Sequence, residues 1–393
     1  MSSDRGGAIV GGGIAGLAAA LFAQKRGLKL PIYERHHAID GGHHLLWIAP
    51  NGMQLLNTLG LANQVSELAT PQKRMQFATK ELRTLISLDS EKLSRDCQFP
   101  IMAIKRRDLW QLLLNEFLRG DGRILYDHEL SNLQVHEEGV LLNFGAQRAP
   151  VVHSYVIGAD GMGSLVRSLL FPESSVRYQG ICTWLGESRS PVAARFVGKT
   201  VEAWGRGTRF VLTSLDGQKV YWSALERPAH YEKNSTEIPE TIGDDLRRLF
   251  SDYHADIRAV LAEADVTRIQ RCNFGVVSGL PSYCRGSVVL IGDAAHGMPP
   301  NMGQGASLGI EDALWVTSCL ARNEPKLAFA QYDRMRRARV HTMLNIANSM
   351  NVLFQPKSKF ASALRDRVAA AVPNALTQMR MAHLYNAPIP DGG

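Results

Sequence analysis

The most constraining feature of the chain is a glycine-rich turn near its start, residues 11–16, which follows the short β-branched run 8–10. Read as G-x-G-x-x-G, the turn uses Gly11 to reverse direction tightly after a strand. Gly13 lacks a Cβ, so the backbone there can approach a pyrophosphate, and Gly16 allows the following helix to lie close to the strand. The pattern predicts a phosphate-binding turn between a strand and a helix.

The residues after this turn complete a strand–helix–strand unit. Apolar positions at helical spacing predict a helix from Ile14 to Arg26, and residues 30–34 read as a second strand with Pro31 at its start. Glu34 ends that strand, where a carboxylate can accept hydrogen bonds from ribose hydroxyls. Because strand, glycines, helix and terminal acid agree, the sequence predicts a dinucleotide site.

Two further glycine motifs follow apolar strand-like runs. The first is residues 158–161, Gly-Ala-Asp-Gly, and the second is the longer segment 289–306. In the second, Asp293 at a strand end can accept from a sugar-chain hydroxyl. Gly303 and Gly305 would let backbone N–H groups approach a flat ligand, and the helix expected near residue 306 would stabilise negative charge at its start.

The charge balance of the chain is mildly basic, with 44 basic and 37 acidic residues and a net charge of +7. The basic residues are scattered apart from small groups at 105–107 and 334–339, and no nucleic-acid reading motif accompanies them. We therefore expect attraction of small anions such as phosphates and no nucleic-acid partner. Hydrophobic residues make up 45%, which excludes a disordered chain.

The cysteines and the N-terminal residues indicate the cellular compartment in which the protein is expected. Five cysteines without a C-x-x-C pair favour free thiols in a reducing compartment, and no His/Cys cluster has metal-ligand spacing. The N-terminus lacks the features of a signal peptide, and the apolar run 17–23 is too short to span a bilayer. We expect a cytoplasmic protein with no bound metal.

The expected secondary structure changes twice along the rest of the chain. Strands are expected within 122–159, and a buried strand over 287–291. Residues 176–226 are rich in aromatic and alternating residues, which favours an antiparallel sheet with one buried face. From residue 306 to about 382 the pattern is mostly helical.

Together, the three motifs resemble those of the class A flavoprotein aromatic hydroxylases, the group of p-hydroxybenzoate, salicylate and urate hydroxylases. The similar segments are residues 6–27 with Glu34, 104–114, 156–167 and 288–313. The resemblance implies an α/β fold with a Rossmann-like, three-layer FAD-binding domain, an inserted and mostly antiparallel substrate sheet, and a helical C-terminal region. It places the FAD-binding domain in 1–70, 98–175 and 280–345, the substrate domain in 71–97 and 176–279, and the C-terminal region in 346–393.

The resemblance also implies the chemistry. In such enzymes NADH or NADPH reduces a tightly and non-covalently bound FAD, O2 adds to it, and a flavin C4a-hydroperoxide hydroxylates or epoxidises a small aromatic or heteroaromatic substrate. Carried over by position, the family's cofactor contacts fall on Gly11, Gly13, Ile14, Ala15, Gly16, Glu34, Arg35, Arg106, Asp160, Gly292, Asp293, Pro300, Gly303, Gly305 and Ala306. For Arg106, a solvated charge beside its basic neighbours is an equally good interpretation.

One segment departs from the family pattern. His43 and His44 stand where small residues usually lie along the flavin. One hypothesis is that either histidine contacts the flavin or the substrate, or carries a covalent flavin. The slightly favoured alternative is a loop insertion that leaves both in solvent.

Candidate substrate contacts come from the expected sheet. Residues 204–210 and 221–222 resemble the strand pair that lines the pocket in urate-hydroxylase-like members, so Arg209 and Tyr221, with His44, are the candidate catalytic residues. A solvated arginine and a half-buried strand tyrosine are equally good interpretations of the first two.

Alternatives of other classes remain. A flavin-dependent halogenase would carry a W-x-W-x-I-like segment, which we do not find. A non-catalytic nucleotide-binding scaffold would be favoured by degenerate motifs, whereas all three motifs are intact.

Near the C-terminus, Leu364, Val368 and Val372 recur at i+4 beside basic residues, a pattern that fits a membrane-surface helix. Packing against the FAD domain is the commoner explanation, and we expect a monomer or homodimer.

Overall fold

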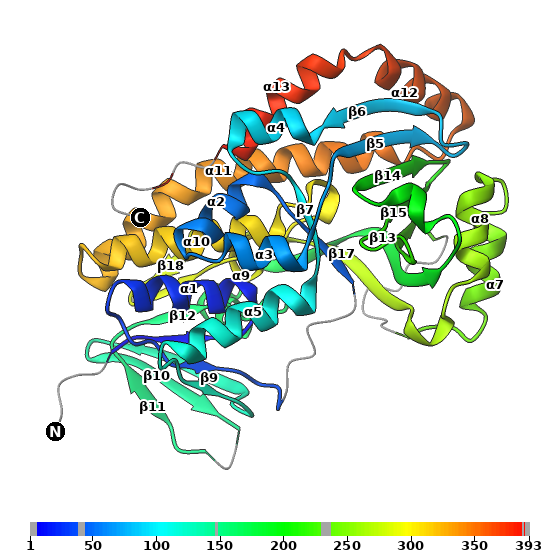
Figure 1. Cartoon of the computed structure of the whole chain (residues 1–393). Helices are drawn as coiled ribbons and strands as arrows, with labels where there is room; N and C mark the ends of the chain where they lie inside the picture. Colours follow the sequence, from blue (N-terminus) through cyan, green and yellow to red (C-terminus); the bar gives the residue numbers. More distant parts are fainter. Residues whose placement is uncertain (1–5, 38–43, 146–147, 229–236, 387–388, 390–393) are drawn as a thin grey trace.

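The computed structural model describes residues 6–37, 44–145, 148–228, 237–386 and 389 (Figure 1). Its central sheet has six strands in the order β18-β19-β12-β1-β2-β8. All neighbours run parallel except β18 and β19. The strands are β1 (Ala8–Val10), β2 (Ile32–Tyr33), β8 (Ile124–Leu125), β12 (Val156–Gly158), β18 (Cys284–Arg285) and β19 (Val288–Leu290).

Both faces of this sheet are covered, which is why its strands consist of buried apolar residues. Helices lie on one face, and on the other lies an antiparallel sheet in the order β11-β10-β9 (Figure 1). The Tyr33 ring lies 4.7 Å from the Phe144 ring and joins these two layers. The helices are α1 (Ile14–Lys25), α2 (Pro50–Thr58), α3 (Ala62–Leu68), α5 (Arg106–Arg119) and α10 (Gly305–Leu320), and the strands are β9 (Leu130–His136), β10 (Gly139–Phe144) and β11 (Val151–His153).

A seven-stranded sheet in the order β17-β13-β16-β15-β14-β5-β6 forms a second body of the molecule. It is antiparallel except between β14 and β5, so the mostly antiparallel sheet expected for residues 176–226 is confirmed and is extended at both edges. Its strands are β5 (Arg74–Thr79), β6 (Thr84–Asp89), β13 (Ser175–Arg189), β14 (Lys199–Trp204), β15 (Thr208–Thr213), β16 (Lys219–Glu226) and β17 (Gln270–Ser278).

The alternation of side chains gives this sheet two different faces. Phe210, Leu212 and Trp222 are buried against α7 (Ile242–Leu249) and α8 (Ala255–Ala262). The opposite face points toward a small sheet in the order β3-β7-β4, made by β3 (Leu45–Ile48), β7 (Met102–Lys105) and β4 (Thr70–Pro71). The polar residues discussed below lie on this second face.

The C-terminal region is helical, as expected, with α11 (Pro325–Phe354), α12 (Lys359–Ala371) and α13 (Asn374–Tyr385). Helices α12 and α13 lie along β6 and α4 (Ser90–Cys97) at the edge of the seven-stranded sheet (Figure 1). The helix of Leu364 and Val368 packs on the protein as expected, but it contacts the seven-stranded sheet at β6. It does not pack through Leu364 and Val368, which are exposed; the buried side chains of α12 are Ser362 and Ala369. No helix in the described part of the chain is long and apolar enough to cross a membrane.

Candidate cofactor and substrate site

Four sequence-predicted residues meet at one edge of the central sheet. Gly11 follows β1, Glu34 follows β2, Asp160 follows β12, and Asp293 follows β19. These four strands are parallel neighbours, so their carboxyl ends lie at the same edge, where ligands bind in open α/β sheets. Segments up to about 280 residues apart in the chain are thereby brought together.

The glycines of the first turn are needed for two different reasons. Gly11 has φ of +105°, and a Cβ there would lie 2.4 Å from the Ala159 carbonyl oxygen. A Cβ on Gly16 would lie 2.0 Å from the Gly11 carbonyl oxygen, so these two positions are fixed by protein packing. A Cβ on Gly13 would meet no protein atom within 4 Å, so that backbone is open to a ligand.

The remaining positions of this turn have distinct surroundings. Ile14 is buried as the first residue of α1, and Ala15 packs so closely on Gly292 that a Cβ on that glycine would lie 2.9 Å from the alanine methyl. The Trp110 Nε1 donates a hydrogen bond to the Gly12 carbonyl at 2.9 Å, which anchors the turn to α5.

The Glu34 carboxylate organises the start of the site. It is buried, and it accepts hydrogen bonds from the Gly12 N–H at 2.8 Å and from the His36 N–H at 3.0 Å. Its side chain therefore lies directly against the glycine turn. Arg35 is exposed beside it, and its Nε donates to His36.

The Asp160 motif forms a compact capped turn. The Asp160 carboxylate accepts hydrogen bonds from the Ser164 hydroxyl and the Val166 N–H, and burial raises its pKa against the effect of those bonds. Ser164 also caps α6 (Leu165–Leu170). Arg167 donates from its two terminal nitrogens to the Met162 and Ala294 carbonyls, which ties this motif to the one after β19.

Asp293 lies between the last parallel strand and α9 (Asp293–His296). Its side chain is accessible to solvent but is enclosed by protein on its other sides, and this enclosure raises its pKa, partly offset by His296 and Arg106. Arg106, half-buried at the start of α5, has its pKa lowered by burial and raised by Asp293. The interaction with Asp293 does not fit the alternative of a simple solvated charge for Arg106.

The start of α10 borders the same edge. Pro300 is exposed, Gly303 has φ of +61°, and a Cβ on Gly305 would meet no protein atom within 4 Å. Gly305 and the half-buried Ala306 begin the helix, so their N–H groups lie at the positive end of its dipole. This arrangement is suited to partial negative charge on a flat ligand.

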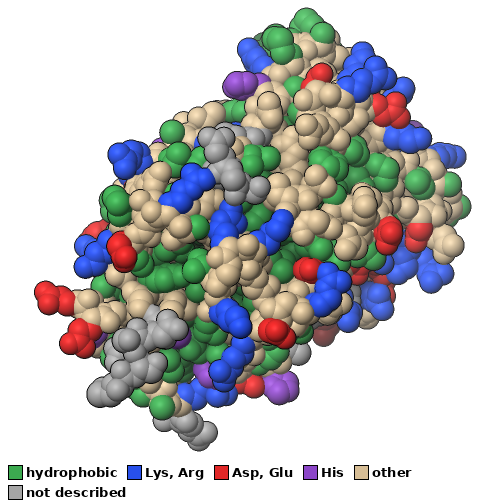
Figure 2. All heavy atoms as spheres, turned by 60° about the vertical axis from the view of Figure 1, so that its left-hand side comes forward, with side chains coloured by type: hydrophobic (Ala, Val, Ile, Leu, Met, Phe, Trp, Pro, Cys, Tyr) green, Lys and Arg blue, Asp and Glu red, His purple; other side chains and the backbone are tan. Residues whose placement is uncertain are grey.

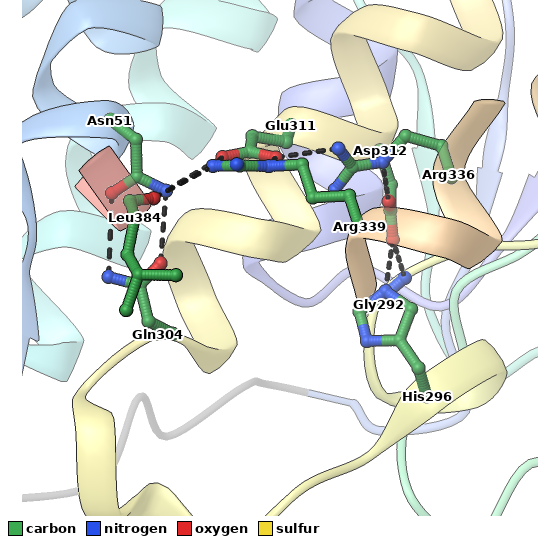
Figure 3. Close-up of polar contacts among 9 residues, drawn as sticks. All are labelled: Asn51, Gly292, His296, Gln304, Glu311, Asp312, Arg336, Arg339 and Leu384. Atoms are coloured by element: carbon green, nitrogen blue, oxygen red, sulfur yellow. Dashed lines mark hydrogen bonds and ion pairs between the residues drawn. The ribbon is translucent and has the colours of Figure 1, made fainter. Parts of the chain in front are cut away.

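A buried charge network underlies this edge (Figure 3). The Glu311 carboxylate contacts Arg336 at 2.6 Å, Arg339 at 2.7 Å and the Asn51 amide at 2.7 Å. The Asp312 carboxylate contacts Arg336 at 2.7 Å and His296 at 2.5 Å. These interactions lower the pKa of both carboxyls against burial, that of Asp312 to about 2.

The network fixes the loops that carry the predicted cofactor contacts. The Gly292 N–H donates to Asp312 at 2.9 Å, and Gln304, directly before α10, exchanges hydrogen bonds with Asn51. These residues are not among the predicted site residues, although two adjacent acids inside the apolar helix α10 are a signal of buried partners. The expectation that the basic group 334–339 attracts external anions is wrong for Arg336 and Arg339, which pair inside the protein.

A cavity lies between β3 and the open face of the seven-stranded sheet. It is partly open to solvent, and its empty volume of about 450 Å³ includes that open space. Aromatic and aliphatic side chains supply one part of its lining, and polar side chains the other. The lining residues are His44, Leu45, Trp47, Leu185, Gly186, Glu187, Tyr221, Trp222, Ser223, Arg268 and Gln270.

The polar part of the cavity is organised around Tyr221 and Glu187, which are paired across β13 and β16. Burial raises the pKa of Tyr221 to about 12, with a contribution from the Glu187 charge, so its hydroxyl is a donor. Burial would raise the pKa of Glu187, but Lys219 at 2.8 Å and Arg268 at 2.9 Å lower it. The cavity therefore combines a neutral phenol with an ionised carboxylate.

The three candidate catalytic residues are not brought together. His44 and Tyr221 line the same cavity, but Arg209 pairs with Leu225, four residues along β16 from Tyr221, which corresponds to about 13 Å. Arg209 is buried and donates to Glu202 and to Asn301, each at 2.9 Å. The interpretation of Arg209 as a solvated surface charge is wrong.

The histidine segment is described only in part. His43 lies outside the described residues. His44 is half-buried, lines the cavity, and accepts a hydrogen bond on its carbonyl oxygen from the Arg106 N–H at 3.0 Å. The alternative that this loop leaves His44 in solvent is therefore wrong, and its contact with the flavin or substrate stays a prediction.

Comparison with known proteins agrees with this geometry. Residues 6–347 match a family described as the FAD binding domain. The chain belongs to this family. Its relatives are FAD-dependent hydroxylases and monooxygenases, so the protein is an oxidoreductase of the class A type.

Two curated relatives cover nearly the whole chain. The aurachin C monooxygenase/isomerase of Stigmatella aurantiaca is 27% identical and covers 92% of each chain. The 2-heptyl-3-hydroxy-4(1H)-quinolone synthase of Pseudomonas aeruginosa is 29% identical and covers 93% of this chain and 94% of the relative.

A solved structure supports the same fold. Klebsiella pneumoniae HpxO, complexed with FAD and uric acid, has a TM-score of 0.87 at 20% identity, over 98% of this chain and 97% of that one.

The residues present fit FAD. An open backbone at Gly13, a buried acid after the second strand, an accessible acid after β19 and a helix start at Gly305 are the donor and acceptor types that a dinucleotide flavin requires. Among the described residues, no three His, Cys, Asp or Glu side chains gather where a metal could bind.

Proposed function

We propose that this protein uses NADH or NADPH and O2 to hydroxylate or epoxidise a small aromatic or heteroaromatic compound. The observation that carries the proposal is the adjacency of two features. An edge of parallel strands suited to FAD lies next to a cavity lined by aromatic and hydrogen-bonding side chains. Strand β3, which lines the cavity, is followed directly by α2, whose Asn51 contacts the start of α10.

In this proposal, three of the strand ends and the start of α5 divide the cofactor between them. Gly13 and the start of α1 hold the pyrophosphate, Glu34 the adenosine ribose, Asp293 the ribityl chain, and Arg106 a ribose or phosphate oxygen. Gly305 and Ala306 direct N–H groups at the flavin ring. When bound, FAD supplies the acceptance of hydride and the activation of oxygen.

The cavity residues bind and orient the substrate. Trp47 and Leu185 supply apolar surface for a flat ring. The Tyr221 hydroxyl donates a hydrogen bond to a ring oxygen or nitrogen, which holds one ring carbon in a fixed position. Glu187, kept ionised by its two cationic partners, accepts a hydrogen bond from a ring N–H or O–H. The chain contributes position and exclusion of water, and no separate nucleophile.

The relatives suggest where a substrate search should begin. The names of two of them refer to aurachin C and to a 3-hydroxylated 4(1H)-quinolone, and others act on urate or 6-hydroxynicotinate. A fused nitrogen heterocycle with a ring carbonyl offers the acceptor and donor that Tyr221 and Glu187 would satisfy. We therefore place 4-quinolones and purines ahead of simple benzoates.

The test is an NAD(P)H oxidation screen with these heterocycles under ¹⁸O2. The proposal predicts that a substrate accelerates NAD(P)H oxidation and gains one labelled oxygen, detected by mass spectrometry. Control reactions lack FAD or substrate. If FAD binds and is reduced but no compound gains labelled oxygen while another electron acceptor restores turnover, the protein is an oxidoreductase of a different reaction type, and the monooxygenase proposal fails.

A further inference from the structure

The C-terminal helices leave a row of large apolar side chains uncovered. On α12, Phe360 is 78% exposed, Leu364 50% and Val368 57%. Residues four apart lie on one face of a helix, so these three form a continuous row, here called the apolar stripe. On α13, Met379 is 64% exposed. Four of the five most exposed large hydrophobic side chains of the described residues therefore lie on these two helices.

The stripe is accompanied by positive charge. Residues 357–386 contain five basic residues and one acid, Asp366, which pairs with Arg365. Lys359 and Arg367 are exposed, and each directly precedes a member of the stripe, so they flank it along one side. The neighbouring helix α4 adds no net charge, since Lys92 and Arg95 balance two acids. Figure 2 shows hydrophobic and basic side chains, with acidic side chains among them, at this upper end of the molecule.

The opposite face of α12 is fixed, so the stripe cannot turn inward. Arg365 donates to the Gly205 carbonyl at 3.0 Å and to the Phe354 carbonyl at 2.9 Å. Its guanidinium also lies over the Trp204 ring, 5.2 Å from the centroid. With Ser362 and Ala369 buried on the same side, the helix orientation is determined by the substrate sheet and by α11.

We infer that α12 and α13 form a docking surface for an anionic lipid bilayer. An exposed apolar row flanked by Lys and Arg is how a helix lies in the interface of a membrane without crossing it. Each basic side chain near an anionic surface adds to the attraction. A second copy of this chain is a poorer partner, because a symmetric contact would bring two positive faces together.

Docking through this surface would orient the seven-stranded sheet relative to the bilayer. Helix α12 packs on β6, the edge strand of the seven-stranded sheet, so that edge would lie next to the bilayer. The aromatic cluster beneath α12, with Trp204 and Phe354 stacked at 4.3 Å, continues toward Arg209 and its partner Asn301. The membrane contact would therefore lie at the β6 edge of the seven-stranded sheet, on the side that carries Arg209.

Flotation of the FAD-loaded full chain with vesicles tests this inference. We expect binding to phosphatidylcholine vesicles containing about one-third phosphatidylglycerol, and at least about tenfold weaker binding to phosphatidylcholine alone. The triple variant F360S/L364S/V368S and the charge variant K359E/R367E should each lower binding to the anionic vesicles by about tenfold or more. Added salt should weaken wild-type binding.

Control variants and a second measurement complete the test. Leu327→Ser removes an equally exposed side chain at the start of α11 and should leave vesicle binding unchanged. Thermal unfolding of each variant checks its fold. Equal binding by the triple variant and wild type, or none by wild type, overturns the inference. Sedimentation that shows a dimer abolished in the triple variant identifies the stripe as a contact between copies instead. None of these outcomes depends on the proposed reaction.

Discussion

The edge of parallel strands predicted to hold the cofactor and the cavity proposed to hold the substrate are built in different ways. At the edge, each contact is set by a strand end followed by a short local motif, and parallel pairing brings the motifs together. In the cavity, neighbours such as Tyr221 and Glu187 meet only because β16 and β13 pair in one register. A local motif determines its own geometry, whereas a cavity wall depends on long-range register, which a single sequence does not reveal.

The largest effect should come from the buried network beneath the edge. Arg336→Met leaves Glu311 and Asp312 without their shared cation, and removing one partner of a buried ion pair costs about 3–5 kcal/mol of unfolding free energy. Urea unfolding measures the loss. The matched control is Arg337→Met. Arg337 is partly exposed, and its ion pair with Asp333 is long, at 3.9 Å, so we expect its loss to change the unfolding free energy by less than about 1 kcal/mol. Equal losses would mean that the network does not hold the edge.

A smaller loss should follow when the glycine turn is overpacked. Gly16→Ala places a Cβ where the Gly11 carbonyl oxygen lies, and we expect about 1–3 kcal/mol of destabilisation. Gly145→Ala is the control, since its Cβ would meet nothing within 4 Å. Unfolding of the apoprotein by urea gives both values. An apoprotein unaffected by Gly16→Ala would contradict the close strand–helix contact.

Acid should remove part of the stability that the buried charge network gives to the fold. The pKa of Asp312 is depressed to about 2 in the folded chain, so its ionised form stabilises the fold above its ordinary pKa. This stability is lost as pH falls from about 4 toward about 2. The stability difference between wild type and Asp312→Asn should therefore shrink over that interval in urea titrations. A difference that is constant with pH would show that the Asp312 charge is not stabilised by its partners.

The smallest effect concerns the cavity. Tyr221→Phe deletes one donor and should lower kcat/KM by about tenfold, the value of one hydrogen bond, with FAD affinity unchanged. Since the pKa of Tyr221 is about 12, the loss should be the same at neutral and mildly alkaline pH. Tyr178→Phe, an exposed residue of the same sheet, is the control. A loss of FAD affinity in Tyr221→Phe would contradict the assignment of cofactor binding to the edge and of substrate binding to the cavity.

The fold, and the meeting of the predicted strand-end residues at one edge, could be predicted from the sequence because both depend on local chemistry. Glu34 stands directly after a short apolar strand, and Asp293 stands three residues after the end of another. Gly11 and Gly16 are required by contacts within a few residues or across one strand pair. The separation of Arg209 from Tyr221 could not be predicted, because it depends on where each residue stands along paired strands. The inward turn of Arg336 and Arg339 could not be predicted either, because it depends on which face of α11 meets α10.

The central claim is that the edge holds FAD through an open backbone at Gly13. The most direct measurement is a titration of apoprotein with FAD, followed by tryptophan fluorescence, in wild type and Gly13→Ala. The account predicts one FAD per chain, released unmodified by acid, and an affinity at least about 100-fold weaker in a variant whose apoprotein is as stable as wild type. Equal affinities, or no binding by wild type, would contradict it.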